Sequence, residues 1–249
     1  MPFPPSRTGD GLSVTPLPYT LDADDPETPP LGLIVLQADE TLEGDMRTTL
    51  RDDPTPLYVT RIPSAPTVTT ETLGAMSTAL EAAARLLPSS RPYRVIGYGC
   101  TSASAVIGSD KVERIVQNAA EVAHVTNPLR AAIACAAHHG ISNLALISPY
   151  IAEVNVPLRA AFAEAGLSTD VFGTFGEAEE AKVARIDAAS LITSALKLGA
   201  DTAVEGVFLS CTNLRTLGVI PHLSAQLGKP VLSSNQALAW HMQQLNRQP

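Results

Sequence analysis

Two cysteines, Cys100 and Cys211, occupy nearly repeated settings in this chain of 249 residues. Each follows an apolar run and precedes threonine and a small polar residue, in YRVIGYGCTS (93–102) and AVEGVFLSCTN (203–213). A thiol at the carboxyl end of a buried strand, where helix-forming sequence resumes, meets backbone N–H groups that favour anions. That setting lowers the pKa of a thiol and makes it a nucleophile or a base. We therefore predict that Cys100 and Cys211 are the catalytic pair of one active site.

The third cysteine provides an internal comparison. One cysteine after a buried strand is usually a small apolar filler, but two cysteines with the same following residues are far less expected by chance. Cys135 lies instead in the alanine-rich run AAIACAAHHG and is predicted to belong to the core. The three cysteines show no CxxC pair and no zinc spacing, and the histidines are scattered. The sequence therefore predicts neither a disulfide scaffold nor a metal site.

Composition narrows the class of protein. The formal net charge is -8 and the pI is about 5.1, with no run of Lys or Arg that would indicate nucleic-acid binding. We read the acidic residues Glu177, Glu179 and Glu180 as a solvated helix face. No apolar run reaches the length of a membrane span, and the N-terminus lacks the features of a signal peptide. We expect a cytoplasmic protein that binds neither membranes nor nucleic acid and, without a GxGxxG or P-loop pattern, needs no cofactor.

Short apolar runs alternate with stretches rich in alanine and leucine along most of the chain. The runs predict buried strands at 31–36, 57–62, 93–99, 143–149, 169–175, 203–210 and 230–234. The other stretches predict helices at 71–87, 127–140, 152–166, 187–200 and 235–245. This alternation predicts an α/β fold with parallel sheets, in which ligands bind beyond the carboxyl ends of the strands. Residues 1–30, rich in proline, are predicted to form an extended arm.

The chain resembles the aspartate/glutamate racemase superfamily and, within it, the branch of maleate isomerases and arylmalonate decarboxylases. The matching pieces are GLIV (32–35), GCTSAS (99–104), SPYIAEVN (148–155) and SCTNLRTLGVIPHLSAQLGKPVLSSN (210–235). The resemblance implies two pseudo-symmetric α/β lobes, each a mostly parallel sheet flanked by helices, with the active site between them and no cofactor. We expect a first lobe at 31–126, which also takes the helix at 235–247, and a second lobe at 127–234.

The resemblance also assigns roles to individual residues. Cys100 and Cys211 match the two catalytic cysteines of the family, and Tyr150 matches a tyrosine that contacts substrate in maleate isomerases. Arylmalonate decarboxylases usually keep only the second cysteine and carry glycine where Cys100 stands, so the presence of both favours isomerisation or racemisation. Hydroxyl and main-chain N–H groups that bind the carboxylate oxygens of a substrate are expected at Thr101, Ser102, Thr212 and Asn213.

One departure from the family pattern lies after the first strand. Maleate isomerases typically carry asparagine there, whereas the run QADETLE (37–43) places Asp39 at that position. A carboxylate would repel a second carboxylate of a substrate and attract an ammonium group, and amino-acid racemases do place an aspartate after their first strand. Asp39 is therefore predicted to bind substrate, and the alternative is that it only caps the following helix.

Three reactions remain open. Two thiols suit racemisation, in which one takes the Cα proton and the other returns a proton to the opposite face. They also suit cis–trans isomerisation through addition of a thiolate to a double bond, while decarboxylation needs one thiol only. We favour a racemase or isomerase of a small amino acid or its derivative, with the ectoine-utilisation branch as the suspected group. The alternatives are a maleate-type isomerase, an arylmalonate-type decarboxylase and a sensor without activity.

The expected partners are a small carboxylate substrate and, because this fold often dimerises, further copies of the chain in a homodimer or higher homo-oligomer.

Overall fold

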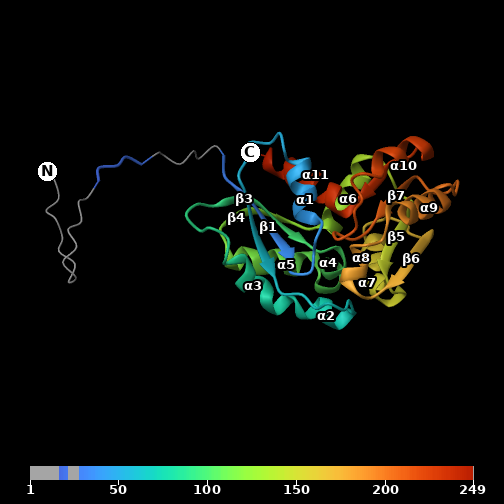
Figure 1. Ribbon diagram of the computed structural model, residues 1–249, viewed down its shortest axis with the longest axis horizontal. Coiled ribbons are helices and arrows are strands. Elements are labelled where there is room, and N and C mark those ends of the chain that lie inside the picture. The colour runs from blue at the N-terminus through green and yellow to red at the C-terminus, as the bar shows by residue number, and fades with distance from the viewer. Residues whose placement is uncertain (1–16, 22–27, 249) are drawn as a thin grey trace.

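The computed structural model describes residues 17–21 and 28–248, and most of the expected arm (1–30) lies outside this part. Two parallel β-sheets lie side by side, with helices around each (Figure 1). The first sheet has the strand order β2-β1-β3-β4 and the second has the order β6-β5-β7-β8. The second order repeats the first with every strand number raised by four. We call each sheet with its helices a lobe, and the two lobes have the same strand topology.

The strands largely follow the apolar runs of the sequence. The first sheet contains β1 (Leu31–Leu36), β2 (Leu57–Ile62), β3 (Tyr93–Gly99) and β4 (Val122–Thr126). The second contains β5 (Leu144–Tyr150), β6 (Phe172–Glu177), β7 (Gly206–Leu209) and β8 (Val231–Ser233). The helices are α1 (Leu42–Thr49), α2 (Thr70–Ala75), α3 (Ser77–Ala84), α4 (Thr101–Ile107), α5 (Ser109–Ala119), α6 (Pro128–His138), α7 (Ala152–Glu164), α8 (Glu180–Val183), α9 (Ala188–Gly199), α10 (Ile220–Leu227) and α11 (Ser234–Asn246). The predicted α/β fold with two parallel, helix-flanked sheets is confirmed.

Helices cover both faces of each sheet, which explains why the central strands are apolar on both sides. On the first sheet, α3 and α5 pack on one face, while α1 and the C-terminal α11 pack on the other. On the second sheet, α6 and α7 cover one face, and α9 and α10 cover the other. Helix α11 places Leu238 and Met242 in the core of the first lobe and Ala237 in that of the second. The lobe boundaries given above stay a prediction.

The structure differs from the sequence prediction at several elements. Strand β4 was not expected, because it is a short edge strand with half-exposed residues and a weak apolar pattern. The helix expected at 71–87 is divided into α2 and α3, where the hydroxyls of Ser77 and Thr78 bond to carbonyls of the preceding turn at 2.8 Å each. Such bonds compete with the backbone bonds of a helix. Strand β6 begins at Phe172, later than expected, and the carbonyl and hydroxyl of Thr169 accept hydrogen bonds from Arg159 instead.

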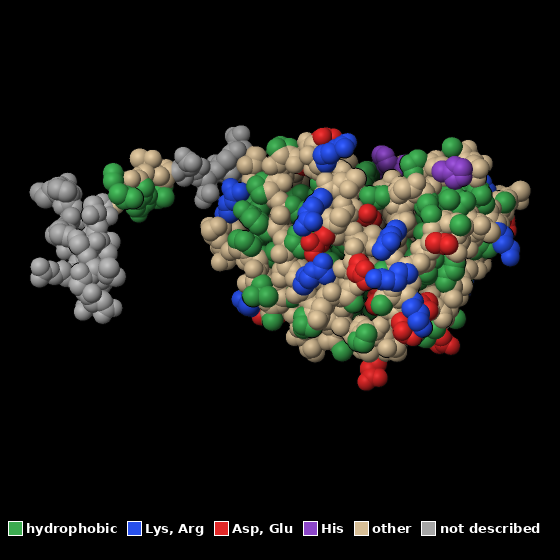
Figure 2. All heavy atoms as spheres, in the orientation of Figure 1, with side chains coloured by type: hydrophobic (Ala, Val, Ile, Leu, Met, Phe, Trp, Pro, Cys, Tyr) green, Lys and Arg blue, Asp and Glu red, His purple; other side chains and the backbone are tan. Residues whose placement is uncertain are grey.

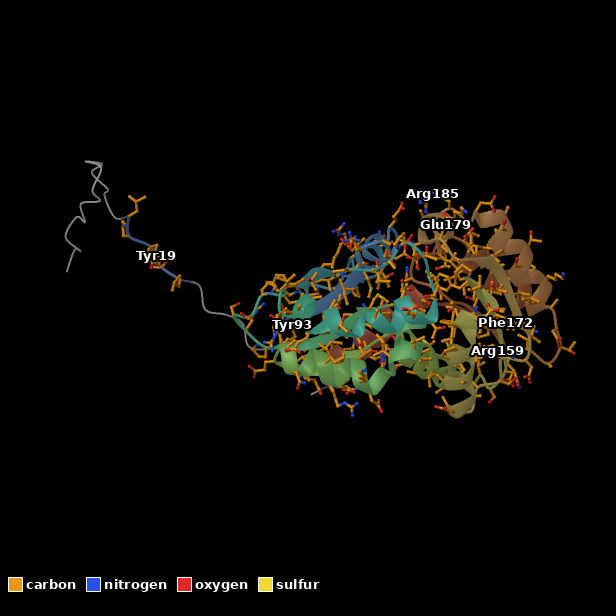
Figure 3. All side chains as sticks on the ribbon, turned by 90° about the horizontal axis from the view of Figure 1, so that it is seen from below. Tyr19, Tyr93, Arg159, Phe172, Glu179 and Arg185 are labelled. Atoms are coloured by element: carbon orange, nitrogen blue, oxygen red, sulfur yellow. The ribbon has the colours of Figure 1, made fainter. Side chains whose placement is uncertain are left out.

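The surface carries mixed charge on the face shown in Figure 2, where Lys and Arg side chains lie among Asp and Glu. The described part of the arm is apolar and stands away from the body, as Tyr19 shows in Figure 3. Its side chains Leu17, Tyr19 and Leu21 are each at least 80% exposed. Within residues 17–21 and 28–248, no helix is long and apolar enough to cross a membrane.

Gly99, the last residue of β3, fixes the approach of the chain to Cys100. A Cβ atom at Gly99 would lie 2.3 Å from Cδ2 of Leu42 and 3.1 Å from the carbonyl oxygen of Ile34. Leu42 is fully buried, so its side chain has little room to move. We predict that Gly99→Ala lowers the free energy of unfolding by about 1–3 kcal/mol, as overpacked sites do.

The matched control for this prediction is Gly44→Ala in the middle of α1, where a Cβ atom would meet nothing within 4 Å. This change should raise the free energy of unfolding by about 0.5–1 kcal/mol, because alanine favours a helix over glycine. Urea unfolding of both variants checks the pair. Equal stability of the two variants would mean that β3 and α1 do not pack as described.

Candidate active site

The carboxyl ends of β3 and β7 open onto one small pocket that residues of both lobes line. All eight residues predicted for the site take part in its lining, together with Leu36 and Glu180. The predicted residues are Asp39, Cys100, Thr101, Ser102, Tyr150, Cys211, Thr212 and Asn213. The free space is about 10 Å³, which is room for about one water molecule. A substrate therefore enters only when the lining side chains or the lobes move apart.

Cys100 follows β3 directly and is the N-cap residue of α4. Its Sγ accepts a hydrogen bond from the N–H of Ala103 at 3.4 Å. The next residue, Thr101, shares a hydrogen bond of 2.7 Å with the hydroxyl of Ser234 at the start of α11. Burial raises the pKa of the Cys100 thiol to about 12. The thiol is therefore neutral until a bound group stabilises its anion.

Cys211 lies two residues beyond β7 and has an unusual backbone. Its φ is 141°, the only positive φ of a non-glycine residue in the part of the chain that the structure describes. A backbone of this kind persists only where its surroundings hold it, and it is often found at functional sites. The N–H of Cys211 donates to the Ser234 hydroxyl at 2.9 Å, and its Sγ accepts from the N–H of Asn213 at 3.3 Å. Ser234, which the sequence analysis did not single out, thus contacts both cysteine turns.

Asp39 holds the turn that leads into α1 and also lines the pocket. Its Oδ1 accepts from the backbone N–H groups of Thr41 and Leu42, at 2.8 Å each. Its Oδ2 is buried without a hydrogen-bond partner. Arg61 on β2 fixes the turn from outside by donating to the carbonyls of Leu36 and Asp39, at 2.9 and 3.0 Å. The two interpretations of Asp39 from the sequence are therefore compatible, one for each carboxylate oxygen.

The hydroxyl of Tyr150 lies between a thiol and a carboxyl group. It is 3.0 Å from the Sγ of Cys211 and donates to Oε1 of Glu180 at 2.7 Å. The other oxygen of Glu180 accepts from the side-chain amide of Asn213 at 3.0 Å. The Tyr150 hydroxyl and the Asn213 amide, expected to face substrate, are therefore engaged with Glu180.

The prediction of a solvated face at Glu177, Glu179 and Glu180 is wrong for Glu180, which is 5% exposed. The chain just before α8 runs extended beside residues of the first lobe, and Glu179 forms a bridge with Thr67. Successive side chains of an extended segment point to opposite sides, so Glu179 faces solvent while Glu180 points inward. The run EAEE (177–180) shows this difference in exposure only if it is treated as an extended segment, in which alternate residues face opposite sides. Figure 3 shows Glu179 and Arg185 together at the edge where this segment reaches the first lobe.

The free polar atoms of the pocket are few. Thr101 is bonded to Ser234, and the hydroxyl of Thr212 donates to the carbonyl of Gly99 at 3.3 Å. Only Ser102 Oγ and Asp39 Oδ2 are buried oxygen atoms without a partner among the side chains that line this pocket. A hydroxyl and a carboxylate oxygen are thus available to a ligand, beside the two thiols. No group of three or more His, Cys, Asp or Glu side chains among the described residues is arranged to hold a metal ion.

The electrostatics of the pocket are dominated by acidic groups out of water. Burial raises the pKa of Glu180, and the hydrogen bonds from Asn213 and Tyr150 oppose this effect. Burial also raises the pKa of Cys211 well above its ordinary value, and the nearby carboxyl of Glu180 adds to the rise. The described lining contains no Lys or Arg. A cation bound in this pocket would stabilise both carboxylates and either thiolate.

Comparison with known proteins gives the chain a family. The family model of arylmalonate decarboxylase matches residues 65–248. Arylmalonate decarboxylase of Bordetella bronchiseptica is 35% identical over 102 residues, which are 41% of this chain and 42% of that protein. The match therefore spans less than half the length of that relative.

Solved structures of related enzymes share the fold. A liganded mutant of arylmalonate decarboxylase has a TM-score of 0.76 at 26% identity, covering 88% of this chain and 93% of that one. The maleate cis–trans isomerase of Nocardia farcinica, with a covalently bound succinylcysteine intermediate, has a TM-score of 0.74 at 22% identity, covering 89% and 94%. The maleate isomerase of Pseudomonas putida with maleate has a TM-score of 0.71 at 20% identity, covering 86% and 90%. The chain belongs to the arylmalonate decarboxylase family, and it shares its fold with the maleate isomerases.

Proposed function

We propose that this protein is a cofactor-independent racemase or isomerase of a small amino acid or amino-acid derivative, with Cys100 and Cys211 as its two proton-transferring groups. The observation that carries the proposal is the composition of the pocket. Two thiols from equivalent strand ends meet there with the free Oδ2 of Asp39 and the buried carboxyl of Glu180, and no Lys or Arg lines it.

The charge of the pocket favours an ammonium group in the substrate. A dicarboxylate such as maleate would bring two further negative charges toward Asp39 and Glu180, whereas an amino acid brings one cation and one anion. Opposite charges within a few ångströms stabilise each other strongly where water is excluded. The ammonium group would accordingly bind at Asp39, and the hydroxyl of Ser102 would donate to the carboxylate of the substrate. A role in ectoine utilisation rests on the resemblance described above.

The reaction follows from this placement. The thiolate of one cysteine takes the Cα proton, and the electron pair of the Cα–H bond moves into an enediolate formed with the carboxylate. The S–H group of the other cysteine then protonates Cα from the opposite face. The barrier lies in the carbanion, so N–H and O–H donors around the carboxylate lower it by stabilising the developing charge.

We expect Cys100→Ala and Cys211→Ala each to lower kcat by about 10²- to 10⁴-fold, because each removes one proton-transferring group. Cys135→Ala is the control, since this cysteine is buried in α6 away from the pocket lining. Chiral chromatography of the product measures the turnover rate of all three variants. A Cys100→Ala enzyme with full turnover would instead indicate one-thiol decarboxylation, and full turnover of both pocket variants would exclude the proposal.

The second prediction concerns Asp39→Asn, which removes a charge and keeps an oxygen to cap the helix. Charge-assisted hydrogen bonds contribute about 1.5–3 kcal/mol, so kcat/KM for an amino-acid substrate should fall about ten- to a hundredfold. Binding of a dicarboxylate should improve, because one like charge is gone. Stability should stay within about 0.5 kcal/mol, as asparagine and aspartate cap helices about equally well. An unchanged substrate preference would show that Asp39 stabilises the start of α1 and does not bind substrate. The hypothesis of a cis–trans isomerase would then be preferred.

A further inference from the structure

The proton of Tyr150 can be assigned from its neighbours. The hydroxyl has one hydrogen and lies 2.7 Å from Oε1 of Glu180 and 3.0 Å from Sγ of Cys211. A carboxylate attracts a hydrogen-bond proton more strongly than a neutral sulfur does. Tyr150 therefore donates to Glu180, and its lone pairs are left to accept the S–H of Cys211. All three groups are buried.

Hydrogen bonds to residues of both lobes hold Glu180 in place. Its Oε2 and its carbonyl oxygen accept from Asn213 Nδ2, at 3.0 and 3.3 Å. Its N–H donates to the carbonyl of Pro66 at 3.0 Å. Glu180 is thus held on both sides, and its carboxyl cannot turn away from Tyr150 without breaking these bonds.

The two thiols differ in their surroundings. The titratable groups that face Cys211 are Tyr150 on β5, Glu180 on α8, Asp39 after β1 and Cys100 after β3. The Sγ of Cys100 accepts a hydrogen bond from the N–H of Ala103, and no side chain of the described residues bonds to this sulfur. Burial raises the pKa of both thiols, and the charge of Glu180 raises both further. The difference between them is geometric: among the described residues the S–H of Cys211 has a side-chain acceptor in Tyr150, whose own proton points to Glu180, whereas Cys100 has none.

We propose that Glu180 is a positioning residue that acts through Tyr150 to keep Cys211 protonated, so that, once a bound ammonium group stabilises one thiolate, Cys100 is the thiolate that accepts a proton and Cys211 is the thiol that donates one. This division of roles rests on the two-thiol function proposed above. In one direction Cys100 first loses its S–H proton to solvent as the substrate cation binds, and the Cα–H bond then breaks and its proton joins the Cys100 thiolate. The S–H bond of Cys211 then breaks, and its proton forms the new Cα–H bond on the other face. The negative charge passes from Cys100 to Cys211, and the reverse reaction starts from that state.

The test measures each thiol without any substrate. Iodoacetamide alkylates thiolates, so the rate of labelling at each cysteine against pH, followed by mass spectrometry, reports its apparent pKa. In the unmodified chain Cys100 should react faster than Cys211 at every pH up to 9. Both thiols line one pocket, so Cys100 also reports how often reagent gains access. Equal or faster labelling of Cys211 would overturn the proposal without the need for any variant.

The first variant is Glu180→Gln, which removes the charge and leaves Tyr150 free to donate to a thiolate at Cys211. The apparent pKa of Cys211 should fall by one unit or more, which speeds its labelling at pH 8 about tenfold relative to Cys100. The matched control is Glu179→Gln, the exposed neighbour that pairs with Lys182 at 2.6 Å. This control should leave both rates unchanged. An unchanged Cys211 in Glu180→Gln would refute the role of Glu180.

The second variant separates action through Tyr150 from simple charge repulsion. In a chain that already carries Tyr150→Phe, Glu180→Gln should change the rate at Cys211 less than threefold. The same tenfold change in both backgrounds would mean that Glu180 acts through space, and the proposal would be wrong. Circular dichroism and the rate at Cys100 check that each variant is folded. Since no step needs turnover, these results stand even if the racemase proposal fails.

Discussion

The active-site region is governed by the free energy of keeping ionisable groups out of water in one pocket. Two thiols and two carboxyl groups are buried there without a Lys or Arg beside them. Burial raises the pKa of both thiols and of Glu180, and the charge of Glu180 raises the pKa of each thiol further. In the turn after β1, a backbone N–H group donates a hydrogen bond to the carboxylate of Asp39. The side chains of Asn213 and Tyr150 donate hydrogen bonds to the carboxyl group of Glu180. A positive charge in the pocket would stabilise the remaining negative charge, and an ammonium group in the substrate would supply it.

The same residues that form the pocket also hold the lobes together. The hydroxyl of Thr41 donates to the carbonyl of Asn213 at 3.0 Å, and the side chain of Asn213 accepts from the N–H of Glu40 at 2.9 Å. The hydroxyl of Thr212 reaches the carbonyl of Gly99, the residue before the first cysteine. Because these bonds cross between the lobes at the site, any opening that admits substrate also disturbs the positions of both thiols.

The sequence predicted correctly those elements whose residue pattern has a single structural explanation. Buried strands show as apolar runs, and β1, β2 and β3 begin and end where those runs do. The repeated cysteine turns identified the two strand ends that meet, because parallel strands of equivalent topology end at equivalent places. The amphipathic helix α5 was missed although Val112 and Val116 stand one turn apart on its buried side. Glu180 could not be found, since a glutamate next to two others looks the same whether a tertiary bridge turns it inward or outward. The roles of the eight predicted pocket residues stay proposals, although the structure brings all of them together.

The most direct measurement of the central claim is incubation of the enzyme in D₂O with one enantiomer of candidate amino acids and N-acyl amino acids, with maleate and arylmalonates alongside. Mass spectrometry and NMR then follow Cα exchange, fumarate formation and CO₂ release. The account predicts that the product enantiomer carries one solvent deuteron at Cα from the earliest time points, while the remaining substrate is still unlabelled, because two different thiols handle the two protons. Formation of fumarate from maleate or release of CO₂ from an arylmalonate, with no Cα exchange in any amino acid, would contradict it.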